Sequence, residues 1–305
     1  MKKISVALLA LLAVAAVAQE QAAPAPQASG QKFSTNLVQR DEAPSYSDLY
    51  CAGFMTTEAI SKTNTISGGI NTPDETQFAR GTMVFVGGGG LQEGSEYSVI
   101  RELKDPNHFE AFNGQHAAQA AAGQPYAELG RLKVVAIRGS QAVAQVEFSC
   151  QNMTLGDIVV PFREHAPVSY RKSGSIERFP AGPGHLNARI VMGQEFDTEL
   201  GQGRKVYLDA GSGKGVKVGD YFRAVRGYDP AKLQGVDNLS YHAPVGEDTQ
   251  QTPGTVTPET AKSLPVRNIG EMIILSVTQS SATAMITNTL EDIRVGDWVE
   301  MEENQ

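Results

Sequence analysis

The stretch GRLKVVAIRGSQAVAQVEFSCQNMTLGDIVV at residues 130–160 decides the fold, because it returns at residues 270–300 as GEMIILSVTQSSATAMITNTLEDIRVGDWVE. The two copies align without a gap, so one structural unit occurs twice along the chain. Further positions are apolar in both copies, among them Leu132/Met272, Val134/Ile274 and Met153/Ile293, which indicates that the same core is built twice. The identical pairs are Gly130/Gly270, Ser140/Ser280, Ala142/Ala282, Ala144/Ala284, Gly156/Gly296, Asp157/Asp297 and Val159/Val299.

Both copies alternate β-branched or aromatic residues with polar ones, which is typical of half-buried strands. A second strand–turn–strand unit precedes each hairpin, at residues 83–101 and 205–226. Each copy opens on a short apolar run, Cys51–Phe54 in the first and its expected counterpart near Ala188–Val191 in the second. Short strands with one apolar face close into barrels or sandwiches, because closure removes exposed sheet edges. We therefore predict an all-β fold of two tandem repeats, each a small six-stranded β-barrel or sandwich.

The repeats are expected at residues 45–163 and 185–301, with a Pro/Gly-rich linker at residues 164–184. Each repeat carries an insert of its own. Residues 106–126 include an Ala-rich piece, Gln115–Ala122, that predicts one or two helical turns. Residues 227–265 are rich in Pro, Thr, Gln and Asp and predict a long exposed loop. Long loops on rigid scaffolds often carry function, so the inserts are the predicted recognition surfaces.

The N-terminus has the pattern of a secretion signal. Lys2 and Lys3 precede an uncharged stretch to Ala18, and small residues at Ala16 and Ala18 predict cleavage before Gln19. Residues 1–18 are therefore predicted to be a signal peptide, with a retained anchor as the alternative. Residues 19–44 are rich in Gln, Ala, Pro and Ser and predict a disordered linker. After cleavage we expect no transmembrane segment and a periplasmic or outer-surface location.

The chain has two cysteines, Cys51 and Cys150. A pair in an exported protein is most simply a disulfide, with two buried free thiols as the alternative. Cys150 aligns with Leu290, which we expect to be an inward position of the second repeat. One repeat would then hold a covalent contact where the other packs aliphatic side chains.

The charge balance argues against nucleic acid as a partner. The formal net charge is −8, and loss of Lys2 and Lys3 with the signal changes it to −10. Nucleic acids and anionic membranes attract patches of Lys and Arg instead.

The Gly87–Gly90 run can be compared with a phosphate cradle, but such loops lead into a helix, whereas this run precedes a strand. We interpret it as a tight turn. The histidines, His108, His116, His165, His185 and His242, show no metal-like spacing. We find no serine elbow, and disulfide bonding would remove the cysteines as nucleophiles. The sequence thus predicts no catalytic residues, no metal site, no cofactor site and no enzyme.

Two charged pairs recur with the repeat. Asp157 and Asp297 follow glycines at turns, where a carboxylate caps backbone N–H groups. Arg101 and Arg226 end equivalent strands. These arginines could bind a polyanion or a sugar, or form one salt bridge in each barrel.

The segments GRKVYLDAG (203–211), GVKVGDYF (215–222), GEMII (270–274) and VGDWV (295–299) carry a resemblance to known families. They resemble the β-rich region that follows the peptidoglycan-binding LysM module in bacterial envelope proteins. They are also similar to the C-terminal domain of flagellar assembly protein T, which belongs to a periplasmic ring of the flagellar motor. The resemblance implies a non-enzymatic envelope role in scaffolding or binding. We find no LysM module in the chain, so wall binding by that module is not implied.

The expected function is that of an exported structural or protein-interaction module of a periplasmic or outer-membrane assembly, with other envelope proteins as partners. The alternative is a peptidoglycan- or polysaccharide-binding module, in which loop aromatics such as Tyr228 and Tyr241 would stack on sugar faces.

Overall fold

A computed structural model describes residues 44–168, 176–180, 185–227 and 257–302. The predicted signal peptide at residues 1–18 lies outside the described residues. The predicted linker at residues 19–44 also lies outside them, except for its last residue, as do parts of the 164–184 linker. Residues 228–256 of the second insert, with Tyr228, Tyr241 and His242, lie outside them too.

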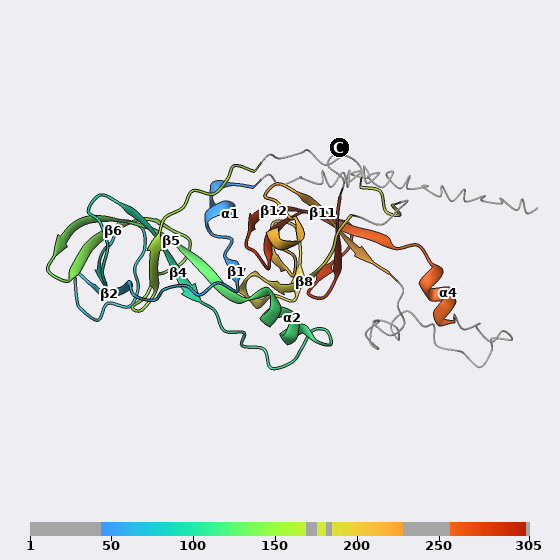
Figure 1. Cartoon of the computed structure of the whole chain (residues 1–305), viewed down its shortest axis with the longest axis horizontal. Coiled ribbons are helices and arrows are strands. Elements are labelled where there is room, and N and C mark those ends of the chain that lie inside the picture. Colours follow the sequence, from blue (N-terminus) through green and yellow to red (C-terminus); the bar gives the residue numbers. More distant parts are fainter. Residues whose placement is uncertain (1–43, 169–175, 181–184, 228–256, 303–305) are drawn as a thin grey trace, which may run out of the picture. The chain divides into compact units, whose positions relative to one another are not determined.

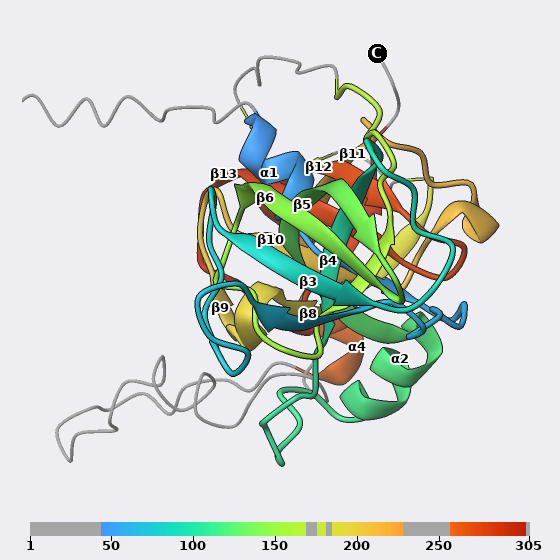
Figure 2. The same cartoon turned by 90° about the vertical axis from the view of Figure 1, so that its left-hand side faces the viewer.

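The first repeat is a closed barrel of six antiparallel strands in the order β5-β4-β7-β2-β3-β6, and a short seventh strand, β1, pairs with the start of β5 (Figure 1). Figure 2 looks onto this barrel from outside. Its strands are β1 (Phe54–Thr56), β2 (Thr65–Gly69), β3 (Met83–Gly87), β4 (Glu96–Glu102), β5 (Gln124–Arg138), β6 (Gln141–Ser149) and β7 (Ile158–Pro161).

The second repeat is also a closed six-stranded barrel, in the order β12-β11-β15-β8-β10-β13. Strand by strand this is the order of the first barrel, so the duplication seen in the sequence is a duplication of topology. Its strands are β8 (Asn187–Gly193), β10 (Lys205–Leu208), β11 (Tyr221–Arg226), β12 (Arg267–Val277), β13 (Ala282–Thr289) and β15 (Trp298–Met301), with β9 (Glu199–Leu200) and β14 (Ile293–Arg294) as a separate small ladder. The predicted all-β fold with two small barrels is confirmed.

The hairpin that decides the fold has the same register in both barrels. Gly130 pairs with Ser149 in the first, and Gly270 pairs with Thr289 in the second. Bulges interrupt both hairpins at matching places, after Arg131 and after Glu271. The ungapped alignment therefore matches the backbone pairing residue for residue.

One predicted equivalence is wrong. Cys51–Phe54 is not the counterpart of Ala188–Val191, because β2 holds the place in the first barrel that β8 holds in the second. In place of the expected strand, Cys51 is the C-cap of a short helix, α1 (Tyr46–Tyr50), and the chain then bends through Ala52 and Gly53 into β1, which begins at Phe54. Ser45 accepts a hydrogen bond from the Asp48 N–H and begins this helix with a capping box.

Each barrel has its own apolar core. Leu132, Val134 and Met153 are fully buried in the first, and Met272, Ile274 and Ile293 in the second. The intervening positions point outward, and Leu290 is 38% exposed. The expectation that Cys150 aligns with an inward aliphatic position is therefore wrong.

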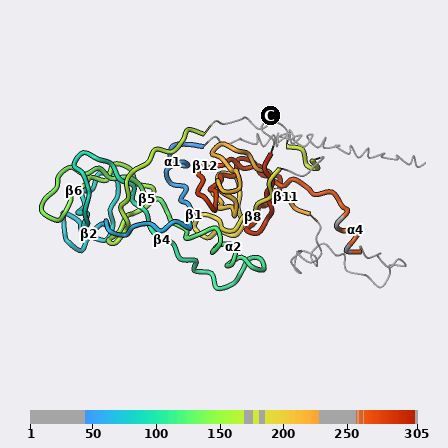
Figure 3. The backbone as a smooth tube through the Cα atoms, in the orientation of Figure 1, coloured from blue at the N-terminus to red at the C-terminus, as the bar shows by residue number. Residues whose placement is uncertain are grey.

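The Cys51–Cys150 disulfide is present and joins the end of α1 to the chain just after β6. The residues between this bond and the end of β1, Cys51–Thr56, form a segment that we call the strap. Figure 3 traces α1 and the strap in blue.

The strap is hydrogen-bonded to hydroxyl groups of the second barrel. The Tyr207 hydroxyl donates to the carbonyl of Ala52 (2.9 Å), and the Thr283 hydroxyl donates to that of Gly53 (2.9 Å). Both hydroxyls are buried, so each contact satisfies a carbonyl that water cannot reach. The register equivalents in the first barrel are Phe85 and Val143, which have no hydroxyl.

The outer face of the second barrel is apolar where the strap region covers it. Ile273, Leu275 and Met285 point away from the barrel core, yet they are buried in a cluster with Ala52. The first barrel has Lys133 where the second has Ile273, and Gln145 where the second has Met285. The two copies therefore share the pattern of core residues but differ in their outer faces, because only the second copy has an apolar face in contact with the strap region.

None of the helices formed by the described residues is both long and apolar enough to span a bilayer.

Candidate functional site

The recurring arginines form matching ion pairs. Arg101 donates from Nε and Nη2 to the two carboxylate oxygens of Asp157, both at 2.8 Å. Arg226 makes the same two-pronged contact with Asp297, at 3.1 and 2.7 Å. Bidentate geometry of this kind is stronger than a single charged hydrogen bond. Of the two alternatives for these arginines, the structure shows the salt bridge, Arg101–Asp157 in the first barrel and Arg226–Asp297 in the second.

The recurring aspartates also cap turns, as expected. Asp157 accepts a hydrogen bond from the Thr154 N–H (2.6 Å), and Asp297 accepts one from the Arg294 N–H (2.8 Å). One carboxylate thus holds both a turn and a strand end in each barrel.

The Gly87–Gly90 run ends β3 and continues as a bend toward β4, so a strand and no helix follows it, while the turn itself lies at Glu93–Gly94. Asn64 holds the bend by accepting a hydrogen bond from the Gly89 N–H (2.8 Å).

Two of the described histidines lie beside a carboxylate. His116 Nδ1 lies 3.6 Å from a carboxylate oxygen of Glu110, and His165 Nε2 lies 3.2 Å from one of Glu128. Among the described residues, no group of three or more His, Cys, Asp or Glu side chains is placed to hold a metal ion.

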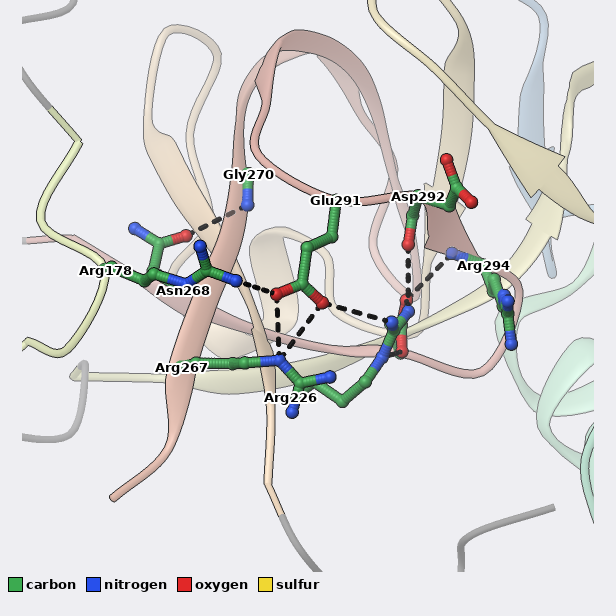
Figure 4. Close-up of polar contacts among 9 residues, drawn as sticks. Arg178, Arg226, Arg267, Asn268, Gly270, Glu291, Asp292 and Arg294 are labelled. Carbon is green, nitrogen blue, oxygen red and sulfur yellow. Dashed lines mark hydrogen bonds and ion pairs between the residues drawn. The ribbon is translucent and has the colours of Figure 1, made fainter. Parts of the chain in front are cut away.

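The sequence reasoning missed a charged cluster at the base of the second insert (Figure 4). Arg226 is the last residue of β11, Arg267 is the first of β12, and the two face each other across the ladder. They therefore mark the two points between which the second insert leaves and rejoins the barrel. Both arginines contact the same carboxylate, that of Glu291, and we call these three residues the clamp.

Distances in the clamp show how the insert is anchored. Arg267 Nε donates to both carboxylate oxygens of Glu291, each at 3.0 Å. Arg226 Nη1 lies 3.7 Å from Glu291 Oε2, while the rest of its guanidinium binds Asp297. Arg178 adds a third cation, with Nη2 at 2.7 Å from Glu291 Oε1. The base of the second insert is thus fixed to the bend between β13 and β14, where Glu291 lies.

Burial alone would raise the pKa of Glu291, but hydrogen bonds and charge from Arg267 and Arg178 outweigh it and lower the pKa below the usual 4.5. The stabilisation from this shift is therefore complete above about pH 4.5 and is lost as the pH falls through the lower, folded-state pKa.

We expect Glu291→Gln to lower the free energy of unfolding by about 1–3 kcal/mol at pH 7, because arginine side chains lose their shared carboxylate. The difference from the unmodified protein should shrink as the pH falls below 4.5, because Glu291 is protonated first in the unfolded chain and, at lower pH, in the folded protein. Urea unfolding at pH 7, 5 and 3 measures this, with the exposed Glu93→Gln as control. A difference that stays constant across the three pH values would contradict the assigned role.

The first insert is docked on the second barrel. Its helix α2 (Gln115–Ala122) forms where the Ala-rich piece predicted it. Gln115 Nε2 donates to the Val191 carbonyl of β8 (3.1 Å), and Ser280 donates to the Ala122 carbonyl (2.7 Å). The helical part of this insert is therefore packed against the second barrel, and the predicted role of the insert in recognition stays a prediction.

Phe112 completes this contact. Its ring lies 3.6 Å below the Arg189 guanidinium, a cation–π arrangement, and its atoms rest against Gly296. A Cβ at Gly296 would lie 2.8 Å from the Phe112 ring, whereas one at the equivalent Gly156 would meet open space.

Gly156 and Gly296 thus form a matched pair, since both have positive φ, 85° and 102°. Gly156→Ala is expected to cost about 1 kcal/mol from backbone strain alone. Gly296→Ala should cost about 1–2 kcal/mol more, because Phe112 must move. In a Phe112→Ala background the two costs should become equal, which a double-mutant cycle of unfolding free energies measures. If Gly156→Ala and Gly296→Ala lowered the free energy of unfolding equally in the unmodified protein, Phe112 would not restrict the side chain at position 296.

Aromatic side chains gather beside the disulfide. Tyr50 stacks on Phe162 with ring centroids 5.8 Å apart, and Tyr46 meets Phe148 edge-on at 5.3 Å. Tyr46 is 49% exposed, and these four rings line a shallow depression together with Arg131. We call these four residues the aromatic patch.

No protein-family model matches the chain, and a search of curated proteins finds no match.

Proposed function

We propose that this chain is a non-enzymatic, exported cell-envelope protein that serves as a structural or protein-interaction module of a periplasmic or outer-membrane assembly. The observation that carries the proposal is the clamp, in which Arg226 and Arg267 at the two ends of the second insert bind one carboxylate. A long insert on a fixed base suits recognition of a partner, because the rigid scaffold limits the freedom that binding must remove.

Further features support export and an envelope role. The N-terminal pattern is that of a signal peptide, and a disulfide persists in oxidising compartments such as the periplasm. The resemblance to β-rich envelope regions points the same way. Recognition would then rest on shape and polar complementarity, and we propose neither a cofactor nor a nucleic-acid partner.

Replacing residues 228–256 by a short Gly/Ser linker tests the proposal, because it retains Arg226, Arg267 and Glu291. We expect the shortened chain to keep its circular dichroism spectrum and unfolding midpoint, but to lose the envelope proteins that the full chain captures. A Gly/Ser replacement of the exposed residues 57–59, which lie outside the second insert, controls for unspecific effects. Undiminished capture by the chain that lacks residues 228–256 would exclude the second insert as the binding surface.

The alternative, a peptidoglycan- or polysaccharide-binding module, is favoured by the aromatic patch. Aromatic faces beside charged groups suit sugar rings, which present apolar C–H surfaces and hydroxyl groups. Here the rings lie next to Glu128 and Arg131. Co-sedimentation with purified peptidoglycan that Tyr46→Ala abolishes would favour this alternative, and no sedimentation of the full chain would reject it.

A further inference from the structure

A hollow of about 200 Å³ opens between the first insert and the second barrel. The insert contributes Phe109 and Glu110, and Asp105 lies directly before it. β8 and the turn after it contribute Met192, Phe196 and Asp197. Its volume is below the roughly 300–1,000 Å³ of pockets for drug-sized ligands. It therefore suits one side chain better than a polymer.

The lining combines an apolar floor with an acidic rim. Three carboxylates line the hollow, and none of its lining residues, all of them described, is basic. Asp105 accepts hydrogen bonds from the Asn107 N–H (2.8 Å) and the Gln119 amide (3.3 Å), and both of these donors are uncharged. Asp197 faces the half-exposed Arg204 at 3.5 Å.

Glu110 is held in its ionised form by its own loop. The backbone N–H groups of Gly114 and His116 donate to its two oxygens, both at 2.9 Å, and with the charge of nearby His116 they lower the pKa of Glu110. Backbone N–H and amide groups thus orient the carboxylates of Asp105 and Glu110, while Asp197 is paired with Arg204 at the outer side of the rim.

The apolar part of the wall is fixed by unusual backbone geometry. Glu195 and Phe196 are consecutive non-glycine residues with positive φ, 61° and 63°. Such residues cost about 1–3 kcal/mol each and persist where the surroundings hold them. Here Phe196 packs against the cluster of Met55, Ala122 and Met192, which keeps its ring at the hollow. Phe109, by contrast, is 90% exposed at the rim and is free to cover an occupant.

We propose that this hollow binds a lysine or arginine side chain of a partner polypeptide. The aliphatic stem would lie against Met192 and Phe196, and the cationic head would reach the carboxylates of Asp105, Glu110 and Asp197. Long cationic side chains bind in this manner because their stems are apolar and their heads carry charge. The inference rests on the proposed function as a protein-interaction module, and it names a second contact besides the second insert.

Met192 gives a direct reporter for the test. We would label the methionine methyl groups of the full chain with ¹³C and titrate it with Nα-acetyl-lysine N-methylamide. The uncharged Nα-acetyl-norleucine N-methylamide has the same stem and serves as the matched ligand. We expect a saturable shift of the Met192 signal with the lysine compound, and binding at least fivefold weaker for the norleucine compound.

Variants then test the rim. Asp105→Asn combined with Asp197→Asn should weaken lysine binding at least fivefold, whereas Glu199→Gln, an exposed acid outside the hollow, should leave it unchanged. An unshifted Met192 signal, or equal affinity for the two ligands, would overturn the inference. Tighter binding of free lysine than of the blocked amide would also overturn it, since a small amine would then be the occupant.

The proposed function can be judged separately. If both aspartate substitutions leave capture of envelope proteins intact while the lysine compound fails to bind, the hollow is refuted and the function of the second insert stands.

Discussion

Serine at both Cys51 and Cys150 is expected to lower the free energy of unfolding by about 2–5 kcal/mol. The bond joins residues 99 positions apart, so its loss frees a long loop in the unfolded chain. It also releases one end of the strap, whose carbonyls accept hydrogen bonds from Tyr207 and Thr283 of the second barrel. Loss of the disulfide should therefore destabilise the first barrel and also weaken the contact between the strap and the second barrel.

Urea unfolding of the double variant and of the unmodified chain, each with and without reductant, measures this effect. Reductant should destabilise the unmodified chain to the level of the variant and should leave the variant unchanged. Hydrogen exchange at Gly53 and Met55 should rise in the same samples. A double variant within about 0.5 kcal/mol of the unmodified chain would contradict this role for the disulfide.

Gly130→Ala is expected to lower the free energy of unfolding by at least about 3 kcal/mol. Gly130 has φ 143°, and a Cβ there would lie 2.1 Å from the backbone oxygen of Phe148. A backbone atom in a paired strand cannot move aside as a side-chain tip can, so the hairpin itself would have to shift. Gly270 at the equivalent position is similarly crowded, with 2.6 Å to the Asn288 oxygen.

Gly139→Ala is the matched control, because Gly139 lies in the same hairpin and has positive φ, 63°, but open space around it. It should cost only about 1 kcal/mol, from backbone strain. Thermal and urea unfolding compare the two variants directly. If Gly130→Ala proved no more costly than Gly139→Ala, close approach of the strands would not explain why both repeats have glycine there.

The duplicated barrel was predictable because it depends on local alternation and turn chemistry. The hairpin, the Gly-Asp turns and helix α2 each leave a signal within about ten residues of sequence. The recurrence of Gly130 at Gly270 then places the same register in both copies. The short helix α1 was missed, because five residues are too few to show helical periodicity, although Ser45 and Asp48 carry the capping-box pattern.

The contacts between the repeats could not be derived in the same way, because they join residues far apart in the chain. A signal was nevertheless present in the differences between the copies. Lys133 and Gln145 of the first barrel are replaced by Ile273 and Met285 in the second, at positions that point outward. This difference indicates that the outer face is covered by other residues only in the second barrel. The positions at which the two repeats differ therefore carry the sequence signal of the strap contact.

The clamp also escaped prediction. Arg226 was recognised through its repeat with Arg101, but Glu291 aligns with the uncharged Gln151 and Arg267 with Ala127, so neither recurs. These two residues belong to the second copy alone, which is the copy that carries the longer insert. The charged residues that occur in only one repeat, Arg267 and Glu291, therefore lie at the base of the insert that distinguishes this repeat.

The most direct test of the proposed function is an affinity pull-down from the native envelope with the chain from Gln19 onward, beside co-sedimentation with insoluble peptidoglycan. We predict enrichment of a defined set of envelope proteins, with the chain remaining in the supernatant of the peptidoglycan sample. Sedimentation with bare peptidoglycan, without enrichment of any envelope protein, would contradict the account and favour glycan binding.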